Sequence, residues 1–316
     1  MNIDIVLCLD TNYLLPAKVT ICSICVNNKD ADLTFHIITD PKSKDVVSSL
    51  SGETGRWNQK IQLYTIEPDM CEGLPFGRPD QPTHASIASY YRLFLASVLP
   101  DTVEKVLYFD CDMIVRHSLA PLWDMDISQY SILACDDMYD MDAAKYNTLH
   151  YYPSEGYFNA GFLLVNLKYW RENDAERMFL DYAQKHPERI IFHDQDVLNV
   201  VLKDSKYRLP FKYNVQDGYL YDTIHFLKWP YEGEYEEAIR NPHVIHYSIR
   251  FKPWHKDSNH PWRKEYLKYV ALAGLDIKDF PARAERLSLY QRLRAVLVKL
   301  GFFSPLLQFR TGIELE

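Results

Sequence analysis

The sequence predicts an α/β fold in which helices flank a Rossmann-like mixed sheet. Short apolar runs alternate with helix-like segments through the first third of the chain, and acidic or amide residues follow several of these runs directly. Such runs are typical of buried strands, and their alternation with helices is typical of parallel strands. With 316 residues, of which 47% are hydrophobic and 25% charged, the chain can bury a sizeable core without disulfide bonds.

The expected elements follow in order from the N-terminus. Residues 3–9 predict a first strand, and Pro16 fits the first turn of the helix after it. Residues 67–82 hold four prolines and two glycines, so we expect a loop there. The other expected strands are residues 33–38, 61–66, 106–109, 132–135, 162–167 and 244–246, and the other expected helices are 43–50, 83–95, 167–186 and 194–202.

Composition excludes several classes of protein. A net charge of −8 argues against a nucleic-acid partner, which needs a basic face. Six cysteines are present, and only Cys22 and Cys25 have C-x-x-C spacing, so we expect reduced, buried thiols. The N-terminus has no basic region before its apolar run, and no apolar run approaches the ~18 residues of a membrane span. We therefore expect a cytoplasmic protein.

Residues 263–316 are expected to form a C-terminal helical segment. Its later part holds six basic residues and one acid: Arg283, Arg286, Arg292, Arg294, Lys299 and Arg310 against Glu285. Apolar residues at helical spacing share one face: Leu289, Leu293, Val296, Leu297 and Leu300. Such a helix can bind an anionic membrane surface, here the inner face of the plasma membrane, or dock on the protein's own core. Periodicity alone does not separate these alternatives.

The strongest chemical signal is an acidic pair at the end of a predicted strand. Asp110 and Asp112 flank Cys111 directly after the run at 106–109. Ligands of open α/β sheets gather at the carboxyl ends of strands. Two carboxylates one residue apart can share a hard divalent cation, which can bridge the oxygens of a diphosphate. An acidic turn without a ligand is the alternative.

A second cluster follows the first strand, at the same predicted edge. It consists of Asp10, Asn12 and Tyr13. A carboxylate and an amide can read the hydrogen-bonding edge of a base while a tyrosine ring stacks on it. Alternatively, Asn12 caps a helix and Tyr13 belongs to the core.

Further candidates lie along the rest of the chain. The imidazole of His246 can bind a metal, and the ammonium group of Lys252 can neutralise a phosphate. Arg92 is a second candidate cation, with a surface salt bridge as its alternative role. Asp194 opens a predicted helix, where an acid also favours the helix dipole, and the amide of Gln195 beside it can hold a sugar.

Together these stretches resemble glycosyltransferase family 8, the retaining, metal-dependent group that includes bacterial lipopolysaccharide and lipooligosaccharide galactosyl- and glucosyltransferases. The resemblance spans about residues 3–262. It rests on the stretches IVLCLDTNY, HASIASYYRLFLASVLP, VLYFDCDMIVRHSLAPLW, YFNAGFLLVNLKYWR, DQDVLN and HYSIRFKPWH. It implies a GT-A catalytic domain at residues 1–262, with a nucleotide-sugar half at about 1–115 and an acceptor half at about 116–262.

The resemblance also implies a role for each candidate residue. The positions of the metal ligands, for Mn²⁺ or Mg²⁺, are matched by Asp110, Asp112 and His246. The positions that hold the rest of the donor are matched by Asp10, Asn12 and Tyr13 for uracil and ribose, Lys252 for the diphosphate, and Arg92 and Asn159 near the sugar. The expected catalytic residues are Gln195, Asp194 and Asp137. If the match to the family is shifted by one residue, Asp136 takes the place of Asp137.

The implied reaction moves a hexose, galactose or glucose, from a UDP-sugar to a hydroxyl of a saccharide or glycolipid acceptor. One departure concerns the family pattern H-x-x-G-x-x-K-P-W, because Ile249 stands at the expected glycine. Glycine permits close approach of the backbone to a phosphate, and Arg250 can compensate with charge. Ile249 thus keeps open the alternative of a catalytically silent protein that binds UDP or glycan. A second alternative is a nucleotidyltransferase, which uses a related sheet and a metal-binding acidic pair.

Overall fold

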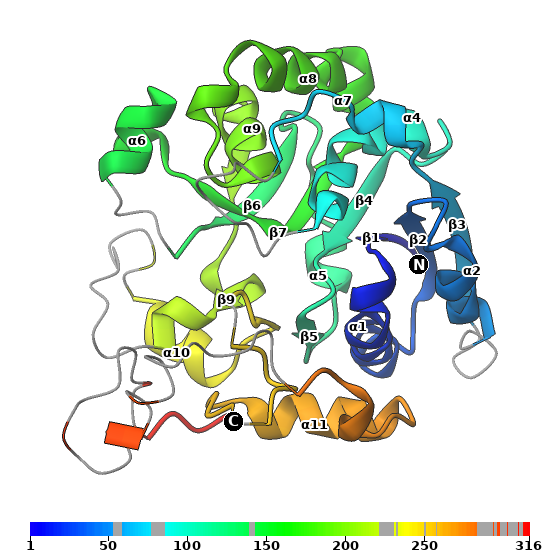
Figure 1. The fold of residues 1–316 in the computed structure, drawn as a ribbon, viewed down its shortest axis with the longest axis vertical. Helices are drawn as coiled ribbons and strands as arrows, with labels where there is room; N and C mark the ends of the chain where they lie inside the picture. The colour runs from blue at the N-terminus through cyan, green and yellow to red at the C-terminus, as the bar shows by residue number, and fades with distance from the viewer. Residues whose placement is uncertain are drawn as a thin grey trace.

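The structure is a computed structural model. It describes residues 1–52, 59–76, 86–138, 143–220, 231, 233–249, 251–256, 258–282, 293, 296–297, 302, 309 and 312–316. Its centre is a seven-stranded sheet in the order β3-β2-β1-β4-β7-β6-β8 (Figure 1). The strands are β1 (Asn2–Cys8), β2 (Asp32–Thr39), β3 (Lys60–Thr65), β4 (Lys105–Phe109), β6 (Ile132–Asp136), β7 (Phe158–Asn166) and β8 (Lys206–Arg208).

The sheet is mixed, as the sequence predicts. Strand β1 pairs in parallel with β2 and β4, whereas β7 runs antiparallel to both β4 and β6. Side chains of β1 alternate between two buried faces, with Ile5 and Leu7 in one core and Val6 in the other. Burial on both faces explains why β1 reads as a continuous apolar run.

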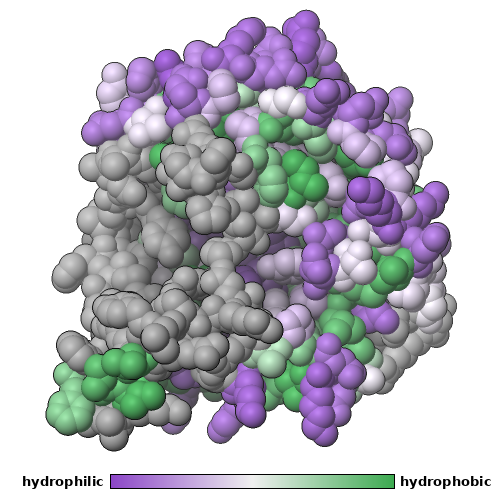
Figure 2. Space-filling view, viewed as in Figure 1, coloured by the Kyte–Doolittle hydropathy of each residue, from purple (hydrophilic) through white to green (hydrophobic). Residues whose placement is uncertain are grey.

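Helices cover both faces of this sheet (Figure 1). One face packs against α1 (Leu14–Asn27), α2 (Lys44–Val47) and α5 (Ala120–Trp123). The other packs against the 3₁₀ helix Ile87–Phe94, α4 (Leu95–Val98), α7 (Leu167–Glu172), α8 (Ala175–Lys185) and α9 (His193–Leu202). The outer surface over α8 is largely hydrophilic, at the top of Figure 2. The remaining α-helices of the described residues are α6 (Ala143–Leu149), α10 (Tyr235–Arg240) and α11 (Arg263–Leu272).

A second, small sheet joins distant parts of the chain. It contains β5 (Met113–Val115), β10 (Val244–His246) and β9 (Val215–Gln216), in the order β5-β10-β9. Strand β10 runs antiparallel to β5 with His246 opposite Met113. The N–H of Tyr247 also donates to the carbonyl oxygen of Asp112 at 3.0 Å. This pairing therefore brings His246 beside the acidic pair that follows β4.

The structure corrects several predicted elements. The prediction of a single helix at 167–186 is wrong, because Asn173 and Asp174 are not helical and separate α7 from α8. Asp174 has a φ of 50°, in the left-handed region that Asp and Asn tolerate better than most residues. Residues 43–50 form only the short α2, followed by the 3₁₀ helix Ser48–Gly52. Strand β7 begins at Phe158 rather than residue 162, so the predicted sugar contact Asn159 lies within the sheet.

The helix expected at 83–95 is also different. Residues 83–85 lie outside the described part of the chain, Ile87–Phe94 is a 3₁₀ helix, and the side chain of Ser86 caps it. Strands β5, β8 and β9 have two or three residues each and were not expected. Runs this short carry too little periodicity to stand out in a sequence.

Other predictions concern the cysteines and the C-terminal segment. All six cysteines are free thiols and five are buried, which confirms the predicted thiols. The amphipathic helix predicted within residues 281–310 lies almost entirely outside the described residues. Among the helices that the structure does describe, none has the length and apolar character needed to cross a bilayer.

Candidate active site

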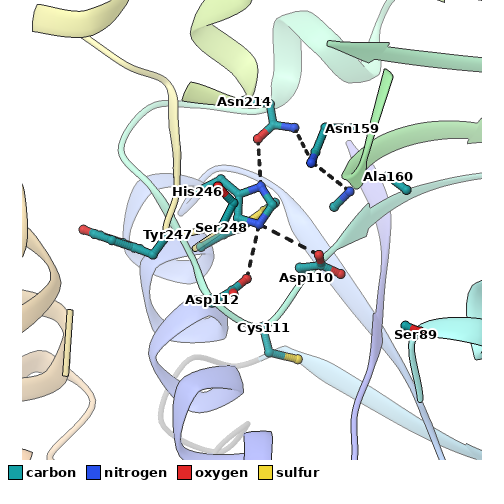
Figure 3. A network of polar contacts seen from close by, with 12 residues as sticks. Ser89, Asp110, Cys111, Asp112, Asn159, Ala160, Asn214, His246, Tyr247 and Ser248 are labelled. Atoms are coloured by element: carbon teal, nitrogen blue, oxygen red, sulfur yellow. Dashed lines mark hydrogen bonds and ion pairs between the residues drawn. The ribbon is translucent and has the colours of Figure 1, made fainter. Parts of the chain in front are cut away.

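Three potential metal ligands converge at the carboxyl end of β4 (Figure 3). Asp110 follows β4, Asp112 precedes β5, and His246 ends β10. One ligand atom from each lies within 4.8 Å of the other two. The Nε2 atom of His246 is 3.4 Å from Oδ1 of Asp112 and 3.9 Å from Oδ2 of Asp110.

Each carboxylate of this group is held on one side and leaves an oxygen facing the imidazole. Oδ1 of Asp110 accepts hydrogen bonds from Arg92 at 2.9 Å and from the hydroxyl of Tyr108 at 3.0 Å. Oδ2 of Asp112 accepts one from Nζ of Lys252 at 2.6 Å. Oδ1 of Asp112 is buried and accepts no hydrogen bond from the described residues. Two carboxylate oxygens and one imidazole nitrogen fit a hard divalent cation such as Mn²⁺ or Mg²⁺.

The charges around Asp112 keep it ionised. Burial alone raises the pKa of a carboxyl group, but the ammonium group of Lys252 opposes this, and the pKa of Asp112 lies below its ordinary value. Burial likewise disfavours the charged form of Lys252, and the carboxylate of Asp112 raises the pKa of Lys252 above its ordinary value. The pair therefore enters any reaction as a buried anion and a buried cation.

Arg92 connects the metal group to α9. Its buried guanidinium donates to Asp110 and lies 2.9 Å from Oδ2 of Asp194, and it also donates to the carbonyl oxygen of Ala160. The guanidinium lies over the ring of Tyr108, 4.4 Å from its centroid. Burial raises the pKa of Asp194 to about 6, although Arg92 opposes the shift. Arg92 is therefore a structural bridge within the site, not a surface residue.

The predicted sugar-side residues form one hydrogen-bonded cluster. Gln195 accepts a hydrogen bond from the N–H of Ala160 at 2.9 Å, and its Nε2 donates to Oδ2 of Asp137 at 3.1 Å. Asn159 donates to the same Asp137 oxygen at 2.9 Å. Asp136 instead pairs with Arg208 at 2.8 Å. Of the two registers considered, the structure therefore brings Asp137 to the cluster.

The residues after β1 lie at the same edge. Asp10 caps the 3₁₀ helix Thr11–Tyr13 by accepting from the N–H of Asn12 at 2.9 Å, so the alternative in which Asn12 caps a helix is wrong. The other Asp10 oxygen accepts from the hydroxyl of Ser86 at 2.7 Å. The ring of Tyr13 meets Trp254 edge-on at 6.5 Å, which places it beside the segment of Lys252. Burial raises the pKa of Tyr13 to about 12, and Lys252 opposes this.

Ile249 stands at the position where the family pattern has glycine, and its backbone N–H is already hydrogen-bonded within the protein. Its N–H donates to Oδ2 of Asp217 at 3.0 Å, and Oδ1 of Asp217 lies 2.7 Å from Nε2 of His260. Since Asp217 and His260 are both buried, this pair anchors the loop before Lys252. The amide of Ile249 is thus not available to a phosphate, and Arg250 lies outside the described residues.

Several residues of the site were not found from the sequence. They are Tyr108, Gly161, Asn214, Ser86 and Asp217. Gly161 offered a signal, since a glycine inside a strand often marks close approach of another group. Ser86 and Tyr108 lie within the stretches that resemble the family but were given no role, whereas Asn214 and Asp217 lie outside those stretches. Only the folded chain brings these four residues to the site.

These features define a GT-A type glycosyltransferase: a mixed sheet flanked by helices, with an acidic pair after its central strand and an imidazole from a second sheet. The chain belongs to glycosyl transferase family 8, whose sequence profile it matches over residues 4–258. The predicted family and fold class are confirmed, and the protein is an enzyme.

Three similar proteins illustrate this membership. General stress protein A of Bacillus subtilis is 26% identical over 286 residues, covering 88% of this chain and 96% of that protein. The lipopolysaccharide 1,2-glucosyltransferase of Escherichia coli K12 is 28% identical over 302 residues, covering 94% and 86%. The crystal structure of galactosyltransferase LgtC in complex with donor and acceptor sugar analogues has a TM-score of 0.75 at 26% identity, covering 92% of this chain and all of that one.

Proposed function

We propose that this protein transfers a hexose from a UDP-sugar to a hydroxyl of a glycan or lipopolysaccharide-type acceptor, with retention of anomeric configuration and with bound Mn²⁺ or Mg²⁺. The observation that carries the proposal is the convergence of Asp110, Asp112 and His246 beside the cluster of Gln195 and Asp137. A glucosyltransferase and a galactosyltransferase are both among the similar proteins, which supports a hexose and leaves both sugars as candidates.

Donor binding divides between two groups of residues. Asp10, Asn12 and Tyr13 hold the uracil and ribose, and Lys252 contacts the diphosphate, within a nucleotide half at about residues 1–115 and an acceptor half at about 116–262. The bound divalent cation supplies charge stabilisation to the diphosphate. Lys252 adds a fixed positive charge that favours departure of UDP.

The sugar-side residues orient the reacting groups. Arg92, Asn159 and Asp194 bind sugar hydroxyls, and Asp137 lies between donor and acceptor. Gln195 is a poor nucleophile, because it is an amide whose oxygen already accepts from the N–H of Ala160. We therefore favour substitution on one face of the sugar. The bond from the anomeric carbon to the phosphate oxygen breaks, the bond to the acceptor oxygen forms, and the acceptor proton passes to the leaving phosphate.

A donor screen tests the proposed function. The purified protein is incubated with UDP-galactose and UDP-glucose, with and without Mn²⁺, and released UDP is measured. We expect slow, Mn²⁺-dependent release of UDP from one of the two, since water can replace the acceptor. Release of diphosphate indicates nucleotidyl transfer instead. Binding of UDP in calorimetry without turnover of any donor indicates the catalytically silent alternative.

The raised pKa of Asp194 predicts an acid limb in the rate. Only the carboxylate pairs with Arg92, so we expect kcat/KM to fall with the ionised fraction of Asp194 below about pH 6 and to be level above it. The measurement is a pH profile of UDP release at saturating Mn²⁺. Asp194→Asn should be slow and lack this limb, and Asp181→Asn, at an exposed ion pair with Lys185, should keep it. An unchanged limb in Asp194→Asn contradicts the assignment.

We further propose that the basic C-terminal segment holds the enzyme at the inner face of the plasma membrane, where lipid-linked acceptors are available. In its described part, Leu293 is 59% exposed, Val296 54% and Phe302 72%, so these apolar side chains are free to contact lipid. Co-sedimentation with anionic vesicles measures the binding. We expect a chain ending at Ala282 to lose it, and equal binding by both chains contradicts the proposal.

A further inference from the structure

Asn214 is a buried amide that touches the metal group without belonging to it. It lies between the 3₁₀ helix Phe211–Tyr213 and β9, and it is 0% exposed. Its Oδ1 is 3.1 Å from Nδ1 of His246, and its Nδ2 is 2.9 Å from Oδ1 of Asn159 (Figure 3). It therefore connects the imidazole of the metal group to the sugar-side cluster.

Gly161 and Asp137 fix the direction of each hydrogen bond in the series that runs from Asn159 through Asn214 to His246. The N–H of Gly161 donates to Oδ1 of Asn159 at 3.0 Å, and Nδ2 of Asn159 donates to the carboxylate of Asp137. A backbone N–H can only donate and a carboxylate can only accept, so the amide of Asn159 cannot be turned over. Asn214 must then present its amino group to Asn159 and its oxygen to His246.

This order determines which nitrogen of His246 carries the proton. An amide oxygen accepts but does not donate, so Nδ1 of His246 must be protonated to bond Asn214. In a neutral imidazole, Nε2 is then free of a proton. That nitrogen is the one that faces Oδ1 of Asp112 and Oδ2 of Asp110.

We propose that Asn214 is a positioning residue of the metal site: it fixes His246 as the Nδ1–H tautomer and so keeps Nε2 available to a divalent cation. The inference rests on the proposed function in that it takes the site to bind metal. Hydrogen bonds to the second nitrogen of a metal-binding histidine commonly set its orientation and tautomer. Here that partner is an amide whose orientation Asp137 and Gly161 set from the sugar side.

The first test leaves Asn214 unsubstituted and needs a variant of His246 only for assignment. Long-range ¹H–¹⁵N spectra of the histidine side chains are recorded with and without diamagnetic Mg²⁺, and His246 is assigned by its absence from His246→Gln. We expect a proton on Nδ1 of His246 in both states. A spectrum in which Nδ1 is bare in either state overturns the proposal.

The second test separates the two hydrogen bonds of Asn214 by measuring the affinity for Mn²⁺ alone in calorimetry. Asn214→Leu removes both bonds, and we expect it to weaken Mn²⁺ binding by about 10- to 100-fold. Asn214→Asp keeps an acceptor for His246 and should retain most of the affinity. The matched control is Asn28→Leu, since Asn28 is also buried and makes two side-chain bonds, at 2.7 and 2.8 Å, far from the metal group. Equal affinity of Asn214→Leu and Asn28→Leu overturns the proposal.

These measurements contain no donor, so they separate this inference from the proposed function. Loss of Mn²⁺ affinity in Asn214→Leu without turnover of any UDP-sugar by the unsubstituted protein counts against the function alone. If the unsubstituted protein shows metal-dependent transfer but Asn214→Leu binds Mn²⁺ as tightly as Asn28→Leu, the result counts against the inference alone.

Discussion

Replacing Asp112 with asparagine is expected to lower kcat/KM for metal-dependent sugar transfer by about 10³-fold, roughly 4 kcal/mol of transition-state stabilisation. The substitution keeps the shape of the side chain but removes the negative charge of a ligand. It also leaves the buried ammonium group of Lys252, 2.6 Å away, without its anion. Initial rates of UDP release over a Mn²⁺ titration measure the effect, and thermal unfolding confirms that the variant is folded.

A suitable control is Asp4→Asn. Asp4 also has a buried side-chain partner, since its Oδ1 lies 2.9 Å from Nε2 of His36, but this pair is on β1 and β2, away from the metal group. We expect its transfer rate to stay within about twofold of the unsubstituted rate, because it touches no group of the site. If Asp112→Asn kept the unsubstituted rate at every Mn²⁺ concentration, the assignment of Asp112 as a metal ligand would be wrong.

Adding one methyl group at Gly161 is expected to cost at least about 100-fold in Mn²⁺ affinity and in transfer rate. A Cβ at this position of β7 would overlap Cε1 of His246 and lie 2.7 Å from Oδ2 of Asp110 and 3.0 Å from Oδ1 of Asn159. Gly161 does not have the positive φ that disfavours side chains, so alanine fits the strand backbone. The effect therefore arises from displaced ligands and not from backbone strain.

Calorimetry with Mn²⁺ and initial rates measure this effect, and circular dichroism reports the fold. Gly52→Ala is the matched control, because a Cβ there meets no atom within 4 Å of the described structure and the backbone conformation is ordinary. If Gly161→Ala bound Mn²⁺ as tightly as Gly52→Ala, the close approach of β7 to His246 and Asp110 would be wrong.

Much of the architecture was predictable because its signals are local. Strand β4 and the acidic pair after it, or α9 with Asp194 and Gln195 in its first turn, are read within a few residues. Buried parallel strands appear as apolar runs, and their ends mark the edge where polar residues gather. The break at Asp174 was missed because a single left-handed residue leaves the surrounding helical periodicity almost unchanged.

Local sequence patterns were enough to predict six of the seven strands of the main sheet, the acidic pair and the family to which the chain belongs. The folded chain was needed to show that β10 pairs with β5 and brings His246 to Asp112, and that Arg92 joins Asp110 to Asp194. It was also needed to show that Asp217 takes the amide of Ile249 and that Asn214 orients the imidazole. The physical reason is that a motif specifies residue types over a short span. Which polar atoms are already bonded, and which are left for a ligand, depends on contacts between distant segments, such as that of Asp112 with Lys252, 140 residues apart.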